Sequence, residues 1–313
     1  MTATSSLPQL KVNVFPGGFN WGLYVGIDQG LFAAEGIDIA VLPTPNSVTQ
    51  MTELSEGKFD IAMTAVDNIV AYREGQGEAP IGAQPEFFAF MGSDSGFLRL
   101  VAASEIASIE NLRGKLLSVD ALTTGYAFVL YEILRRNGMI AGDYRLRRVG
   151  GMIQRLNSML DGNEVATLLS APYNLVARSR GLTQLVSAVS VVGPYQGNVA
   201  AARRSWAQAN RDKVVAFIRA YRRAIAWLYE PTNREQAIAT LIRHVPGMSK
   251  DLAEASYPEL LAPEDGFFRD CRIDLAGLRC VLDLRSRYAT PQKQLSDPMQ
   301  YCDLSYFVQA IAG

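Results

Sequence analysis

Short runs of alternating apolar and polar residues, each followed by an apolar stripe at helical spacing, recur through the first two thirds of the chain. Leu10, Val12 and Val14 alternate with polar residues until the break at Pro16. Residues 116–119 form another apolar run, and a helical pattern follows it. Strands that alternate with helices in this way predict an α/β fold with mainly parallel strands.

Beyond Val199 the pattern changes, and only helical spacing remains. Thr232 and Glu235 have the spacing of a capping box, and Asp274 can cap a later helix. One helix carries a continuous apolar stripe of Val214, Ile218, Tyr221, Ile225 and Leu228. The sequence therefore predicts a helical final part that packs against the first lobe.

The length of 313 residues exceeds what one hydrophobic core usually supports, and it predicts two lobes with a cleft between them. We expect lobe 1 to comprise residues 1–95 and 197–313, and lobe 2 to comprise residues 96–196. Turn-forming residues separate two apolar runs near the first boundary. Residues 92–98 and 194–199 are therefore predicted to be the two crossover strands that form the hinge.

Charge is balanced, with 30 basic and 31 acidic residues and a net charge of -1. This balance gives no electrostatic footprint for nucleic acid, and no apolar stretch is long enough for membrane insertion. A small molecule is the expected partner. The first residues have no signal-peptide pattern, so we expect a periplasmic protein if a leader was removed and a cytoplasmic one otherwise.

Residues typical of metal or covalent chemistry are few. Cys271, Cys280 and Cys302 have no metal-binding spacing, and His244 is the single histidine. We therefore expect no metal and no cofactor. This composition favours binding over catalysis, but an enzyme built from carboxylates, tyrosines and arginines stays open.

Four segments together resemble one known family. They are residues 22–37, with the order glycine, aromatic residue and Glu-Gly, then residues 57–62, 111–115 and 301–307. The pattern is similar to that of the thiamine-precursor-binding and alkanesulfonate-binding periplasmic proteins. The resemblance extends over roughly residues 10–310 and so concerns the whole fold.

The resemblance implies a periplasmic-binding-protein-like fold of type II, with two lobes, a central ligand cleft and two crossover strands. It also implies a solute-binding protein that delivers a small organic, anionic or aromatic ligand to an ABC transporter permease. The alternative is a cytoplasmic enzyme on the same fold, of the pyrimidine-synthase, decarboxylase or desulfinase type. The histidine and lysine that serve the yeast pyrimidine synthases have no match here.

Candidate ligand-binding residues follow the strands of lobe 1, because ligands of open α/β sheets bind where strands lead into helices. Phe19, Asn20 and Trp21 come after the first strand, and Trp21 either stacks on a ligand or packs in the core. Thr64 and Asp67 follow the third strand. Asp67 either pairs with a cationic group or caps its helix.

In lobe 2, Thr123, Thr124 and Gly125 precede a helix. Hydroxyls and backbone N–H groups at a helix start favour an anion, so we expect an anionic group of the ligand here. A threonine that caps the helix is the alternative interpretation.

Further candidates come from the loops near the second boundary. Tyr173, Tyr195 and Asn198 could complete an aromatic and polar wall, since tyrosine suits a cleft that opens and closes. Arg99 follows the first crossover strand and either neutralises an anion or is a surface charge.

Overall fold

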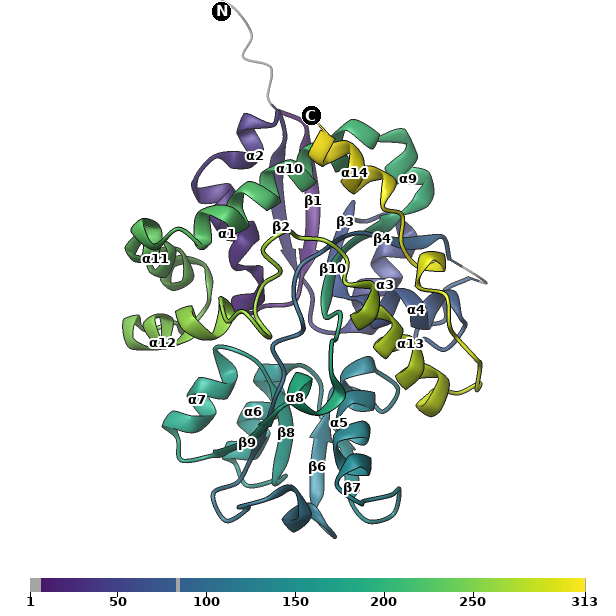
Figure 1. Ribbon diagram of the computed structural model, residues 1–313, viewed down its shortest axis with the longest axis vertical. Coiled ribbons are helices and arrows are strands. Elements are labelled where there is room, and N and C mark those ends of the chain that lie inside the picture. The colour runs from purple at the N-terminus through teal and green to yellow at the C-terminus, as the bar shows by residue number, and fades with distance from the viewer. Residues whose placement is uncertain (1–6, 83–84, 313) are drawn as a thin grey trace, which may run out of the picture.

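The computed structural model describes residues 7–82 and 85–312 and contains two five-stranded sheets, one in each lobe (Figure 1). The sheet of lobe 1 has the order β2 (Asp38–Pro43), β1 (Gln9–Val14), β3 (Ile61–Ala65), β10 (Asn198–Arg203) and β4 (Phe87–Gly92). The sheet of lobe 2 has the order β7 (Arg145–Arg148), β6 (Leu116–Val119), β8 (Ala166–Leu169), β5 (Arg99–Ala102) and β9 (Thr183–Ser187).

Each sheet combines a parallel part with an antiparallel part. Strand β1 is parallel to β2 and β3, and β6 is parallel to β7 and β8. Strands β10 and β5 run antiparallel to both of their neighbours. The predicted α/β class and the two lobes are confirmed, and the antiparallel strands are those that enter or leave a lobe.

Helices cover both faces of the lobe 1 sheet. The apolar stripe predicted between Val214 and Leu228 lies on α10 (Arg211–Leu228), and all five of its residues are fully buried. Helix α10 packs against α1 (Trp21–Asp28), α2 (Leu31–Ala34) and α14 (Ser305–Ala312). On the other face lie α3 (Ser47–Glu56) and α4 (Val66–Arg73), which approach β3 and β10.

Two segments connect the sheets and lie side by side. Residues 93–98 join β4 to β5, and residues 193–197 join α8 (Ala188–Val192) to β10. The amide of Gly197 donates to the Asp94 carbonyl over 2.8 Å, and a Cβ on Gly197 would lie 2.1 Å from the Gly96 nitrogen. Only glycine permits this approach. The segments lie where the sequence predicts the crossovers, and their action as a hinge stays a prediction.

The Asp94 carboxylate holds these segments together from inside. It is fully buried and accepts hydrogen bonds from the backbone of Gly96 at 2.8 Å and of Asn198 at 3.1 Å. Burial raises the pKa of Asp94, and these donors oppose the shift.

A third segment links the lobes between α12 (Lys250–Leu260) and α13 (Leu275–Tyr288). Its Asp265 pairs with Arg99 at 2.8 Å and accepts a hydrogen bond from Ser187 at 2.8 Å. Helix α13 then packs against α4 of lobe 1 and α5 (Gly125–Arg136) of lobe 2. The final part of the chain therefore contacts both lobes.

Remaining helices cover lobe 2 or the outer side of lobe 1. In lobe 2 these are α6 (Met152–Leu160) and α7 (Tyr173–Ser179), and α7 contacts α12. In lobe 1 they are α9 (Arg204–Ala209) and α11 (Arg234–His244).

One local expectation is wrong and another is confirmed. The capping box at Thr232 does not form, because a 3-10 turn (Pro231–Asn233) precedes α11 and Asn233 occupies the cap position. Asp274 does cap α13, since its carboxylate accepts from the Ala276 amide at 2.9 Å.

Candidate functional site

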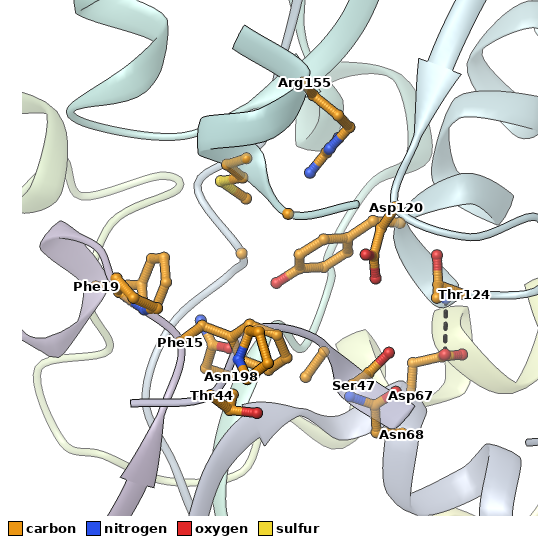
Figure 2. A pocket seen from close by; sticks show the side chains of 18 of the residues that line it. Phe15, Phe19, Thr44, Ser47, Asp67, Asn68, Asp120, Thr124, Arg155 and Asn198 are labelled. Atoms are coloured by element: carbon orange, nitrogen blue, oxygen red, sulfur yellow. Dashed lines mark hydrogen bonds between the residues drawn. The ribbon is translucent and has the colours of Figure 1, made fainter. Parts of the chain in front are cut away.

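A cavity of about 150 Å³ lies between the lobes, where the carboxyl ends of β1, β2, β3 and β6 meet (Figure 2). It is large enough for a molecule the size of a benzene ring. Lobe 1 contributes Phe15, Pro16, Phe19, Thr44, Pro45, Ser47, Ala65, Asp67 and Asn68. Lobe 2 contributes Asp120, Thr124, Gly125, Tyr126, Gly151, Met152, Ile153, Gln154 and Arg155. Gly96 comes from the connecting segment 93–98, and Asn198 is the first residue of β10.

Aromatic rings form much of the apolar wall. Phe15 and Phe19 follow β1 and approach the cavity from lobe 1, and Tyr126 lies in the first turn of α5. Burial raises the pKa of Tyr126, with the charges of Asp94 and Asp67 adding to the shift, so its hydroxyl stays neutral. A flat or apolar ligand body fits such a wall.

Asp67 lines the cavity, but its carboxylate already accepts hydrogen bonds from other residues of the chain. Its oxygens accept from Arg285 Nε at 2.6 Å and Nη2 at 3.1 Å. Both side chains are almost fully buried, at 2% and 1% exposure. Arg285 also donates to the Thr123 carbonyl at 2.8 Å, so this pair joins α4, α13 and lobe 2.

The start of α5, where the sequence predicts an anionic group of the ligand, already holds an anion of the protein. The Gly125 amide donates to Asp67 Oδ2 over 2.7 Å, a bond drawn as the dashed line in Figure 2. A Cβ on Gly125 would lie 2.4 Å from the Asp67 side chain. The expectation is revised, because a carboxylate 58 residues away in sequence satisfies this helix terminus.

A second carboxylate, that of Asp120, faces the cavity from lobe 2 at the end of β6 (Figure 2). It forms no hydrogen bond or ion pair with any residue that the structure describes. Burial raises the pKa of Asp120, and the charges of Arg155 and Arg148 only partly offset that effect.

Arg155 is the one arginine that lines the cavity. It is 3% exposed, and its guanidinium donates to the carbonyls of Gly150 at 3.0 Å and Leu168 at 2.7 Å and to Thr167 Oγ1 at 3.1 Å. Desolvation lowers the pKa of Arg155. These bonds fix the guanidinium to the lobe 2 sheet.

Of the twelve predicted site residues, five line this cavity and seven do not. Those that line it are Phe19, Asp67, Thr124, Gly125 and Asn198. Thr124 Oγ1 donates to the Ala121 carbonyl at 3.2 Å, and the Asn198 amide group donates to Asp94 at 3.1 Å.

Trp21 belongs to the core of lobe 1 and not to the cavity. Its side chain is fully buried, its indole N–H donates to the Ala237 carbonyl at 2.9 Å, and its ring contacts Tyr257 edge-on at 5.5 Å. Asn20 is also buried and donates to the Phe15 carbonyl at 2.6 Å. Trp21 turns inward because it lies on the face of α1 that packs on its neighbours, and Asn20 lies in the 3-10 turn (Gly18–Asn20) just before that helix.

Two further candidates support the cavity wall from outside it. Thr64 lies beneath Asn68 and accepts a hydrogen bond from that amide at 2.9 Å. Tyr195 is buried behind Tyr126, with ring centroids 6.4 Å apart.

The other three hold the lobes together. Arg99 pairs with Asp265 instead of facing the cavity. Thr123 Oγ1 donates to Glu78 at 2.8 Å, and Tyr173 donates to the Pro16 carbonyl at 3.2 Å. These bonds cross between lobe 2 and lobe 1.

Sequence reasoning missed several lining residues. Phe15, Thr44 and Asp120 also follow strands, so the rule that located the predicted residues would have included them. Asn68 is next to Asp67 in the first turn of α4, so the same rule includes it. Arg155 carries no such signal, because a polar residue on an amphipathic helix usually faces solvent.

Thiols and the imidazole lie away from the cavity lining. Cys271 and Cys302 are buried, and burial raises the pKa of Cys302 to about 11. His244 pairs with Asp28 at 2.8 Å and stacks on Tyr24. Among the described residues no cluster of metal-binding side chains occurs, and none of their helices is long and apolar enough to cross a membrane.

Comparison with known proteins identifies the family. The family model described as NMT1/THI5 like matches residues 20–234, and the chain therefore belongs to that family. A search of the curated proteins found no match.

Solved structures share the fold at low sequence identity. The periplasmic nitrate-binding protein NrtA from Synechocystis PCC 6803 has a TM-score of 0.79 and 13% identity, covering 98% of this chain and 89% of its own. The periplasmic aliphatic sulphonate binding protein SsuA from Escherichia coli has a TM-score of 0.73 and 16% identity, covering 95% and 92%. The desulfurization enzyme DSZB has a TM-score of 0.67 and 11% identity, covering 97% and 99%.

Proposed function

We propose that this member of the NMT1/THI5-like family is a solute-binding protein that closes on a small organic molecule and presents it to an ABC importer outside the cytoplasmic membrane. The cavity between the lobes carries this proposal. Residues from both lobes and from the connecting segment 93–98 line it, so a ligand there contacts both of the parts whose relative position changes on closure.

The chemistry of the lining also favours binding over turnover. Its polar groups are amides, hydroxyls, carboxylates and one guanidinium, and the lining residues include no histidine, cysteine or lysine. An enzyme of this fold needs a titratable group beside the reacting atom, and Asp120 is the candidate that the cavity offers for that role.

The test is capture of a small molecule by the intact protein. The protein is incubated with a metabolite extract of its source organism, desalted and denatured, and the released molecules are identified by mass spectrometry. Ser47→Trp fills the cavity from the first turn of α3 and is the control. We expect one compound to be retained by the wild type and not by this variant.

Solution scattering checks the accompanying motion. The captured compound should lower the radius of gyration, because the lobes close around it. Retention of the same compounds by Ser47→Trp, or no retention at all, would contradict the proposal. Release of a chemically altered compound would favour the enzyme.

A further inference from the structure

The two carboxylates of the cavity have different partners. Asp67 accepts three hydrogen bonds, two of them from the buried guanidinium of Arg285, so its charge is compensated within the chain. Asp120 faces the same cavity from the other lobe and has none among the described residues. Asp120 is therefore the carboxylate of this cavity that has no hydrogen-bond partner in the described part of the chain.

Neighbouring cations do not supply the missing partner. Arg155 points into the cavity region from α6, but its Nε and Nη1 atoms donate to main-chain and threonine oxygens of lobe 2 (Figure 2). The charges of Arg155 and, to a smaller extent, Arg148 act on Asp120 without a hydrogen bond, and the Arg148 guanidinium pairs with Glu78 at 3.0 Å. Neither forms an ion pair with Asp120 in the described part of the chain.

An interlobe cavity that contains a half-buried, unpaired carboxylate favours a ligand that donates hydrogen bonds. A charged group removed from water is stabilised only when a partner replaces the lost solvent. The aromatic rings of Phe15, Phe19 and Tyr126 form an apolar wall of the same cavity, so the donor belongs to a molecule with a flat or apolar body.

Building on the proposed function, we infer that the ligand is an organic nitrogen compound with a flat apolar body, whose amine, amidine or ring N–H donates to Asp120. The cavity prefers a cation to a neutral molecule of the same shape, and a neutral molecule to an anion. A carboxylate or sulfonate head group would meet Asp120 with its own charge unopposed, while the α5 terminus that could receive it holds Asp67.

Three probes of one shape test this order. Benzamidine is the cation, benzamide the neutral molecule and benzoate the anion, and each is titrated calorimetrically into the intact protein near neutral pH. Charge-assisted hydrogen bonds correspond to a change of about tenfold or more in affinity. We expect benzamidine to bind at least about tenfold more tightly than benzoate.

Asp120→Asn keeps the shape of the side chain and removes its charge. It should weaken benzamidine binding about tenfold or more, leave benzamide nearly unchanged and reduce the discrimination against benzoate. Asp161→Asn is the matched control, because Asp161 is an exposed residue of the same lobe at the end of α6. It should leave all three affinities unchanged.

The inference is overturned if benzoate binds as tightly as benzamidine, if Asp120→Asn changes both equally, or if no probe binds. Its failure is separable from that of the proposed function. Capture of an oxyanion from the metabolite extract would support the solute-binding function but contradict the proposed role of Asp120. Capture of nothing would instead remove the solute-binding function.

Discussion

Asp67 and Asp120 reach one cavity from opposite lobes, and each lies within two residues of the carboxyl end of a strand. Asp67 accepts hydrogen bonds from a buried arginine and from a helix N-terminus, whereas Asp120 has no hydrogen-bond partner among the described residues. The two carboxylates thus have the same residue type and a similar position after a strand, although Asp67 has a structural role and Asp120 is available to a ligand. The partners from distant parts of the chain make the difference.

Removing Asp67 should have the largest effect. Asp67→Ala leaves the Arg285 guanidinium buried without a counter-charge, and breaking such a pair costs about 3 to 5 kcal/mol of the free energy of unfolding. Urea denaturation of Asp67→Ala and Asp120→Ala measures the contrast. Equal losses in both variants would break the comparison between the two carboxylates.

Trp21 and Phe19 extend the contrast to aromatic residues. Trp21→Ala removes a fully buried side chain and should lower the free energy of unfolding by about 3 to 5 kcal/mol, with little effect on affinity for a cavity ligand. Phe19→Ala, which alters the cavity lining, should weaken binding more than it weakens folding. Thermal unfolding measures the stability of both variants, and benzamidine titration measures their affinity. A Trp21→Ala variant with lower affinity and unchanged stability would contradict the position of Trp21 in the core.

Asp120→Asn should raise stability slightly near neutral pH, by less than the loss expected for Asp67→Ala. Burial raises the pKa of Asp120, so the folded state retains its proton to a higher pH than the unfolded chain does. Wild-type stability relative to Asp120→Asn therefore falls as pH rises from the ordinary aspartate pKa through the raised one. The charged neighbours that act on Asp120 are present in both proteins; they are Arg155, Arg148 and Glu78. The difference between the two proteins therefore reports on Asp120 alone.

Measuring the unfolding free energy of both proteins from acid to neutral pH checks this sign. A difference that stays constant with pH would mean that the Asp120 carboxyl has the same pKa in the folded and unfolded states. A difference of opposite slope would mean that an unobserved donor stabilises its charged form.

Thr124→Val should have the smallest effect. The hydroxyl makes one hydrogen bond, to the Ala121 carbonyl, which is worth about 0.5 to 1.5 kcal/mol of stability. If the anionic group expected from the sequence were held at this helix start, the variant would lose about tenfold or more in anion affinity. With Asp67 at the helix terminus we expect nearly unchanged benzoate affinity, and calorimetry of wild type and variant distinguishes the two expectations.

Local patterns in the sequence predicted the strand at Leu10, Val12 and Val14 and the buried stripe of α10, because burial on one face leaves a period in the residues themselves. They did not predict the helix α8, since its residues Ala188–Val192 continue an apolar run without a break. Ile242, an apolar residue of α11, is 41% exposed because α11 lies on the outside of lobe 1.

Only part of the site follows from local patterns. Strand ends located Phe19, Asp67, Thr124 and Gly125, since the carboxyl ends of parallel strands converge. The pairing of Asp67 with Arg285 spans 218 residues, and the position of Trp21 depends on Ala237 and Tyr257. Contacts of this kind are set by the tertiary fold and leave no local signal.

The most direct test of the account is a crystal structure of the protein with benzamidine bound. We expect the ring between Phe15, Phe19 and Tyr126, and an amidine nitrogen about 2.7 to 2.9 Å from an Asp120 carboxylate oxygen. Asp67 should keep its bonds to Arg285 and Gly125 in that complex. An amidine that pairs with Asp67 instead, with Asp120 left unpartnered, would contradict the central claim.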